Sequence, residues 1–288
     1  MLLGVIAAAG LIAMAAPSAG AAGPDTQAAD SYSVTEAMQP AWKTKLVALH
    51  DKQLAGTMTA ADVASYDAIL NTYAMGLPAG SRAGVAPLAS GSNQLAGTQR
   101  SQDKNYYCGP ATAMSIVVSW WLSGRRSTTN SALQPGVGVT QAALATSTYL
   151  DTDDLGQTPW NATMTRGLNL WLYGRLDAFY YHYTPSSASA LTSHVETDID
   201  AGAMVAADTY EPANIASKHY NGHPVAQTIR HWPSIYGYYN SGASIRFQDP
   251  AYQGKGMTWS ASSPYFNLSN SIAWNYMTQY GATYGIVW

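Results

Sequence analysis

The spacing of apolar residues predicts a helical hairpin near the start of the chain. A stripe between about residues 34 and 54 recurs at helical spacing, and its regular part is expected to begin only at Pro40. The members of this stripe are Met38, Trp42, Leu46, Val47 and Leu54. A second apolar stripe opens at Thr59 and Asp62, whose spacing is that of a capping box, and ends near residues 76–78. We interpret the two stripes as paired helices.

The pattern beyond residue 101 passes from helical spacing to short strand-like runs. Helical spacing comes first, at residues 111–122, 140–149, 163–173 and 187–199. Strand-like runs follow at residues 203–210, 228–239 and 244–248, and the turn Asn240-Ser241-Gly242 separates the last two. Helices followed by strands predict the α+β fold class. Residues 79–100, rich in Gly, Ser and Ala with almost no charge, are interpreted as a linker.

The first residues of the chain have the pattern of an export signal. Residues 1–16 are almost wholly apolar, and Ala19-Gly20-Ala21 is a small-x-small cleavage pattern, although no Lys or Arg precedes the apolar run. The predicted organisation is a signal peptide (1–22), an N-terminal helical hairpin or pro-segment (23–78), a linker (79–100) and a main domain (101–288). We therefore expect a secreted, extracellular protein without an integral membrane domain.

Composition and charge narrow the classes of function. The chain of 288 residues is 47% hydrophobic, which is enough for a sizeable core, and only 11% charged, with a net charge of -3. This charge balance lacks the basic face of a nucleic-acid-binding protein. The 20 Tyr and 9 Trp of the chain are compatible with a solvent-filled binding groove and with an ordinary hydrophobic core. Cys108 is the one cysteine in the sequence, so it has no partner for an internal disulfide.

The residues around Cys108 favour a nucleophile over a structural thiol. Gly109 leaves room for the backbone of a substrate, and Pro110 suits the first helical position. A cysteine at a helix N-terminus lies at the positive end of the helix dipole, which favours the thiolate. Attack on an amide also needs donors for an oxyanion. The N–H of Cys108 is one candidate donor, and the side-chain amide of Gln102, six residues upstream, is the other.

Among the six histidines, His231 is the best candidate for the general base. It opens a strand-like run, and Asp249 ends the next such run, so an antiparallel pairing of the two strands would bring their side chains together. The carboxylate would then fix the tautomer and orientation of the imidazole. His223 has no comparable carboxylate in the sequence, and we interpret it as a loop histidine before Pro224.

These motifs together resemble those of the C39-like peptidase family, in the papain-like cysteine peptidase group. The resemblance is carried by Gln102, by Cys108-Gly109-Pro110-Ala111, by Gly202-Ala203-Met204-Val205, by His231 before Tyr236-Gly237-Tyr238, and by Asp249-Pro250. It covers residues 101–288 and implies a papain-like fold, with the nucleophile at the N-terminus of a central helix packed on an antiparallel sheet. It also implies Cys108 as nucleophile, His231 as general base and acid, Asp249 as its orienting carboxylate and Gln102 in the oxyanion hole. Arg230 replaces the glycine common before this histidine, and Pro233 interrupts the strand that follows.

The resulting expectation is a secreted cysteine peptidase that hydrolyses amide bonds in a peptide or protein substrate. Two alternatives stay open: acyl transfer or cell-wall amide cleavage by the same residues, and an extracellular binding module without activity. We expect no metal and no cofactor. Residues 151–156 lack the third ligand and the distal Glu of a calcium loop, and the histidines show no zinc spacing.

Overall fold

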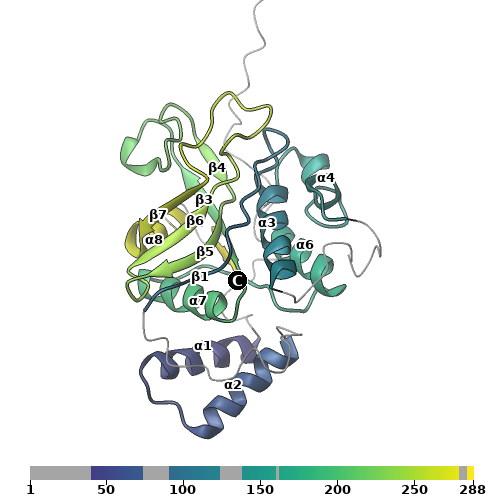
Figure 1. Ribbon diagram of the computed structural model, residues 1–288. Helices are drawn as coiled ribbons and strands as arrows, with labels where there is room; N and C mark the ends of the chain where they lie inside the picture. Colours follow the sequence, from purple (N-terminus) through teal and green to yellow (C-terminus); the bar gives the residue numbers. More distant parts are fainter. Residues whose placement is uncertain (1–39, 74–90, 124–137, 160–161, 279–283) are drawn as a thin grey trace, which may run out of the picture. The chain divides into compact units, whose positions relative to one another are not determined.

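An antiparallel sheet forms the centre of the fold. The computed structural model describes residues 40–73, 91–123, 138–159, 162–278 and 284–288, and within them eight strands make one sheet (Figure 1). The strands are β1 (Asn93–Gln94), β2 (His182–Tyr183), β3 (Val205–Glu211), β4 (Ile229–His231), β5 (Ser234–Tyr239), β6 (Ser244–Gln248), β7 (Tyr265–Ser269) and β8 (Gly285–Val287). Six of them lie in the order β2-β8-β3-β5-β6-β7, while β1 pairs with β5 and β4 pairs with β3. All these pairings are antiparallel.

Helices cover both faces of this sheet. The helices are α1 (Ala41–Leu54), α2 (Ala60–Tyr73), α3 (Cys108–Leu122), α4 (Gln141–Leu144), α5 (Thr152–Leu155), α6 (Ala162–Tyr173), α7 (Ala188–Asp200), α8 (Asn270–Thr278) and the short 3-10 helix η2 (Ala216–Lys218). Side chains alternate between the faces of a strand. Along β3 and the residue before it, Met204 and Ala206 join the apolar cluster of α3 and α6, whereas Val205 and Ala207 join the cluster of α7 and α8. The sheet therefore separates two cores.

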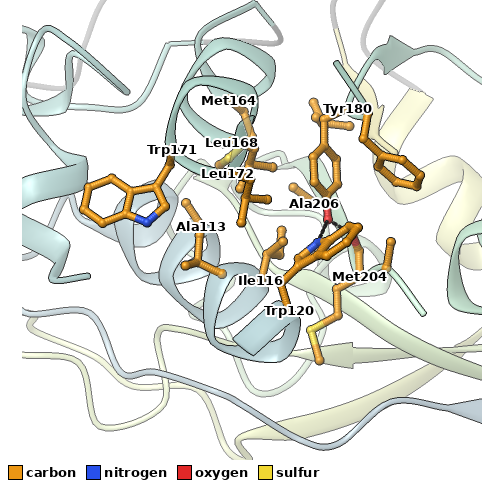
Figure 2. Close-up of a cluster of buried hydrophobic side chains, with 14 of the residues drawn as sticks. Ala113, Ile116, Trp120, Met164, Leu168, Trp171, Leu172, Tyr180, Met204 and Ala206 are labelled. Atoms are coloured by element: carbon orange, nitrogen blue, oxygen red, sulfur yellow. Dashed lines mark hydrogen bonds between the residues drawn. The ribbon is translucent and has the colours of Figure 1, made fainter. Parts of the chain in front are cut away.

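The core beside α3 fixes the helix that carries Cys108. Figure 2 shows Ile116 and Trp120 of α3 packed against α6 and β3. The indole N–H of Trp120 donates a hydrogen bond to the Tyr180 hydroxyl (2.7 Å), which in turn donates to the carbonyl of Met204 (3.1 Å). These bonds satisfy the polar atoms of two buried aromatic side chains, and they tie α3 to the strand β3.

The N-terminal hairpin is attached to the sheet domain by buried polar pairs. The ammonium of Lys43 on α1 lies 3.4 Å from Asp198 on α7, and both side chains are fully buried. Two residues further along α7, Asp200 accepts a hydrogen bond from Nε2 of His50 (2.7 Å). The Lys43 ammonium also lies 4.1 Å from the ring centre of Trp288, within cation–π range. All described residues belong to one compact unit of the chain, Tyr32–Trp288.

The α+β prediction is confirmed, with differences in detail. Pro40 immediately precedes α1, and Thr59 and Asp62 exchange the reciprocal hydrogen bonds of a capping box. The run at 228–239 is two strands, β4 and β5, because Pro233 interrupts it. The helix expected at 140–149 is only the single turn α4. The pattern did not predict β7 or α8, and β1 lies inside the residues interpreted as a linker.

The predicted signal peptide and much of the predicted linker lie outside the described residues. They fall in residues 1–39 and 74–90. Among the helices that the structure describes, none combines the length and the apolar character that a membrane span requires.

Candidate active site

Cys108 is the first residue of α3, as the sequence predicts. The structure therefore places the nucleophile candidate at the N-terminus of a central helix packed on an antiparallel sheet. Its side chain is partly exposed. Tyr107 precedes it, and the Tyr107 hydroxyl donates a hydrogen bond to Asp153 (2.6 Å), which also binds the ammonium of Lys104 (2.8 Å). The segment that leads into α3 is thus anchored on α5. The backbone N–H of Cys108 lies in the first turn of α3, where a helix offers no acceptor for it.

Gly109 has a different role from the one expected. The sequence suggested that its missing side chain leaves room for a substrate. In the structure, a Cβ at this position would collide with the side chain of Thr158, so the glycine admits Thr158 against the first turn of α3. The Thr158 carbonyl also accepts a hydrogen bond from the indole N–H of Trp232 (3.3 Å). Gly109 therefore serves the close packing of the segments that surround the site.

His231 ends β4, and hydrogen bonds from two elements fix its backbone. The hydroxyl of Thr209 on β3 donates to the carbonyl of His231 (2.9 Å). The hydroxyl of Thr112, one turn along α3 from Cys108, donates to the carbonyl of Trp232. The side chain of His231 is almost fully buried. The helix that carries the thiol therefore directly holds the segment that carries the imidazole.

Asp249 follows β6 and lies beside His231. Strands β5 and β6 pair with Ser234 opposite Gln248, so the residues that flank this pair come close together, as the sequence predicts. The ring nitrogen Nε2 of His231 is 2.8 Å from Oδ1 of Asp249. The backbone N–H of Ala251 donates to the same oxygen (2.8 Å), and the carboxylate is fully buried.

The His231 imidazole couples the carboxylate to the thiol. Burial lowers the pKa of His231, but the charge and hydrogen bond of Asp249, followed by a hydrogen bond with Cys108, raise it from 6.5 to about 10. Burial raises the pKa of Asp249, yet the charges and hydrogen bonds of His231 and His223 hold it well below its usual 3.8. The arrangement favours a charged imidazolium between the carboxylate and the sulfur.

Gln102 lies in the same region, but its side chain bonds elsewhere. It is buried, and its backbone N–H donates to the carbonyl of Pro250, the residue after Asp249 (2.9 Å). The side-chain Nε2 donates to the carbonyl of Lys104 (2.8 Å), and Oε1 has no hydrogen-bond partner among the described residues. Within the described parts of the chain, no hydrogen bond joins Gln102 to Cys108. One N–H of the amide stays available for a ligand, since a primary amide has two.

His223 lies in a loop, as interpreted, but the expectation that it has no carboxylate partner is wrong. Its Nε2 is 3.0 Å from Oδ2 of Asp249, and its Nδ1 is 3.0 Å and 3.1 Å from the two carboxylate oxygens of Glu211. Asn221 donates to the same Oδ2 (2.7 Å). The local sequence holds no sign of this, because Glu211 and Asp249 lie 12 and 26 residues from His223 along the chain.

A second carboxyl group near Cys108 was also not predicted. Asp208 on β3 is fully buried, and neither of its oxygens has a hydrogen-bond partner among the described residues. It lies two residues beyond Ala206, on the strand face that packs against α3. Burial, and then the nearby Cys108, raise the pKa of Asp208 well above 3.8, and Arg230 lowers it only in part. This environment therefore favours the neutral form of the carboxyl group more than water does.

The residues around Asp249 are also those that could hold a metal ion. His223, His231 and Asp249 offer ligand atoms that lie within 4.8 Å of one another, and all three residues are buried. Both imidazoles already direct a ring nitrogen at the Asp249 carboxylate. A metal ion would have to displace these hydrogen bonds, so the geometry suits a hydrogen-bonded network better than a preformed metal site.

Comparison with known proteins places this site within a family. Curated protein sequences include no significant match. Among solved structures, the fold is similar to that of xylellain, a cysteine protease from Xylella fastidiosa, at 11% sequence identity, with 63% of this chain and 81% of that chain covered and a TM-score of 0.32. The model of the Peptidase_C39 like family matches residues 92–282, which include Gln102, Cys108, His231 and Asp249. The chain belongs to the Peptidase_C39 like family.

Proposed function

We propose that the protein is an exported cysteine peptidase that hydrolyses peptide bonds with Cys108, His231 and Asp249. The observation that carries the proposal is the buried His231–Asp249 pair (2.8 Å) beside a thiol at the N-terminus of α3, where Cys108 contributes to the raised pKa of His231. Membership of the Peptidase_C39 like family supports the same chemistry. A buried carboxylate behind a histidine, with a nucleophile in front of it, is the arrangement that activates a side chain for acyl transfer.

Each residue has a defined part in the reaction. The thiolate of Cys108 attacks the scissile carbonyl carbon and forms a C–S bond, and the developing oxyanion is received by the N–H of Cys108 and the free amide N–H of Gln102. The His231 imidazolium then donates its proton to the leaving amine as the C–N bond breaks. Neutral His231 takes a proton from water, and the hydroxide attacks the thioester. The carboxylic acid leaves, and the thiolate and imidazolium are restored.

Alkylation of the thiol tests the core of this proposal without any known substrate. Iodoacetamide should label Cys108 faster than a free model thiol near neutral pH, since the imidazolium of His231 stabilises the thiolate. The variant His231→Gln should label more slowly, and Cys108→Ala should not label at all. Labelling of the wild-type protein no faster than the model thiol would exclude an activated nucleophile.

Analysis of products separates hydrolysis from the other reactions. Incubation with mixed peptides should release new amino termini, while an added amine should not be incorporated in their place. Extended or crosslinked products would favour acyl transfer, and release of amines from cell-wall peptides alone would favour an amidase. Activity that survives EDTA but not iodoacetamide is expected, and activity lost to EDTA would contradict a thiol mechanism without a metal. A binding module is indicated if Cys108→Ala leaves every measurable effect of the protein unchanged.

Export belongs to the same proposal. The apolar residues 1–16 and the small residues around Ala21 support removal of a signal peptide of about 22 residues. Amino-terminal sequencing of protein recovered from the culture medium should find a chain that begins just after Ala21 or Ala22. Recovery of the intact chain from the cell interior would contradict it.

A further inference from the structure

His223 lies between two buried carboxylates, and this position goes beyond the three residues of the proposed reaction. Its Nε2 contacts Asp249 at 3.0 Å, and its Nδ1 contacts Glu211 at 3.0 Å. The side chains of His223, Glu211 and Asp249 are all fully buried. These groups form one network in which imidazoles and carboxylates alternate. It runs from Cys108 through His231, Asp249 and His223 to Glu211.

The number of hydrogen-bond donors determines the charge of His223. An ionised carboxylate only accepts hydrogen bonds, and a neutral imidazole has one N–H to donate. Both ring nitrogens of His223 face carboxylate oxygens, so both contacts are satisfied only when both nitrogens are protonated. Burial lowers the pKa of His223, and repulsion from His231 lowers it further, but the hydrogen bonds to Asp249 and Glu211 outweigh both effects and raise it above 6.5.

Other titratable groups also face this network: burial and the charges of Glu211 and Asp249 raise the pKa of Tyr276 on α8, and burial and the charge of Glu211 raise that of Tyr220. The backbone N–H of Tyr220 donates to Glu211 (3.4 Å), and Nδ1 of His219, beyond η2, lies 3.1 Å from the same carboxylate. The ring of Trp259 packs against His223 at 4.9 Å between ring centres. Within the described residues, His231 and His223 are the cationic groups that contact Asp249, and Asn221 supplies its neutral side-chain donor.

We propose that His223 and Glu211 are positioning residues, which hold Asp249 ionised and oriented toward His231. The inference rests on the proposed cysteine peptidase mechanism and deepens it. His223 and Asn221 occupy Oδ2 of the carboxylate, which leaves Oδ1 directed at His231 and the N–H of Ala251. Glu211 stabilises the positive charge on His223, and without it the imidazolium would be buried beside a single counterion.

The variants His223→Gln and Glu211→Gln test the inference through the dependence of Cys108 alkylation on pH. His223→Gln removes the cation beside Asp249, and Glu211→Gln removes the carboxylate that keeps His223 protonated, so in both variants Asp249 should take up a proton at higher pH. The acid-side midpoint of the alkylation curve is then expected to rise by about one pH unit. On a peptide substrate, kcat should fall about tenfold with little change in KM. The double variant should lose no more than the worse single variant, because the two residues act as one unit.

Two controls separate this role from a general loss of stability. His219→Gln removes a histidine that touches Glu211 but has no hydrogen bond to Asp249 in the described structure. His50→Gln removes another buried histidine paired with an aspartate, on α1. Both controls should keep the alkylation curve of the wild-type protein, even if the unfolding temperature falls. Wild-type curves for both His223→Gln and Glu211→Gln, with a reactive thiol, would overturn the inference.

A measurement on the wild-type protein keeps the inference testable if the variants do not fold. Nitrogen NMR of labelled histidines at pH 6.5 should show His223 mainly protonated on both ring nitrogens. His194 is the internal reference for a neutral ring, since burial lowers its pKa to about 4. A neutral His223 would overturn the inference. If alkylation shows instead that the wild-type thiol is unreactive, the proposed peptidase function fails. The NMR spectrum still determines the charge of His223 in that case.

Discussion

Asp249 is the residue on which the hydrogen bonds of the site converge. Each of its two oxygens accepts two hydrogen bonds, one from a histidine and one from an amide. Burial raises the pKa of this carboxylate, but the charge of His231 and then the hydrogen bonds and charge of the two histidines lower it well below 3.8. The orientation of His231 therefore depends on a carboxylate that has no freedom to rotate.

The variant Asp249→Asn should retain the fold and lose most of the activity. The asparagine amide would direct N–H groups at imidazole nitrogens that now donate to oxygen, so His231 would adopt the wrong tautomer. We expect kcat to fall by about three to four orders of magnitude, as observed when a comparable buried aspartate is neutralised. Steady-state kinetics measure the change. Asp103→Asn, on an exposed pair with Lys255, is the matched control and should retain full activity.

The raised pKa of Asp208 predicts that its replacement by asparagine stabilises the protein. Its pKa is raised in the folded protein, so its contribution to stability is present below pH 3.8 and is lost as the pH rises. Asp208→Asn, which imitates the neutral form, should raise the unfolding temperature at pH 8 more than at pH 4. An equal shift for Asp208→Asn would show that the buried group is not neutral.

At the scale of elements, α1 is joined to α7 by charges that have no contact with water. Burial lowers the pKa of Lys43 to about 8, although its partner Asp198 counteracts the shift. Burial likewise raises the pKa of Asp198 to about 6, against the effect of Lys43. A pair of this kind adds little net stability, but the loss of one partner leaves the other charge buried alone.

The variants Lys43→Met and Lys45→Met compare a buried and an exposed lysine on the same helix. Lys45 bonds only to the exposed Ser65 hydroxyl in the described structure. We expect Lys43→Met to reduce the free energy of unfolding by about 3–5 kcal/mol, and Lys45→Met to change it by less than about 0.5 kcal/mol. Urea unfolding measures both values. The double variant Lys43→Met/Asp198→Asn should regain much of the lost free energy of unfolding. Equal effects of Lys43→Met and Lys45→Met would contradict a buried ion pair.

Across the whole molecule, the pairing of His231 with Asp249 predicts how stability depends on pH. The pKa of His231 rises from 6.5 to about 10 on folding, so its stabilisation is complete below pH 6.5 and is lost as the pH rises toward 10. The pKa of Asp249 is lowered, so its stabilisation is present above pH 3.8 and is lost as the pH falls below that value. Urea unfolding of wild-type protein and His231→Gln from pH 5 to 10 should give a difference that shrinks with rising pH. A constant difference would contradict the charged pair.

The sequence by itself determined the parts of the fold that depend on near neighbours. Helical spacing, the Thr59–Asp62 capping box and the break at Pro233 are local effects of side-chain volume and backbone geometry, and they predicted several helices, the interrupted strand and the α+β class. The position of Cys108 at a helix N-terminus follows from Pro110 in the first turn. The closeness of His231 to Asp249 follows from two adjacent strands joined by a turn.

Only the tertiary structure decided which distant groups share the site. Glu211, His223 and Asp249 come from segments that are far apart in the chain, and no periodicity records their meeting. Burial raises the pKa of both carboxyl groups, but the two histidines lower that of Asp249, whereas Asp208 has no hydrogen-bond donor among the described residues and its pKa stays raised. The role of Gly109 also depends on a distant segment, because its missing side chain leaves room for the side chain of Thr158. The sequence indicated the nucleophile and its base, and the packing of the sheet against α3 determined the groups that control them.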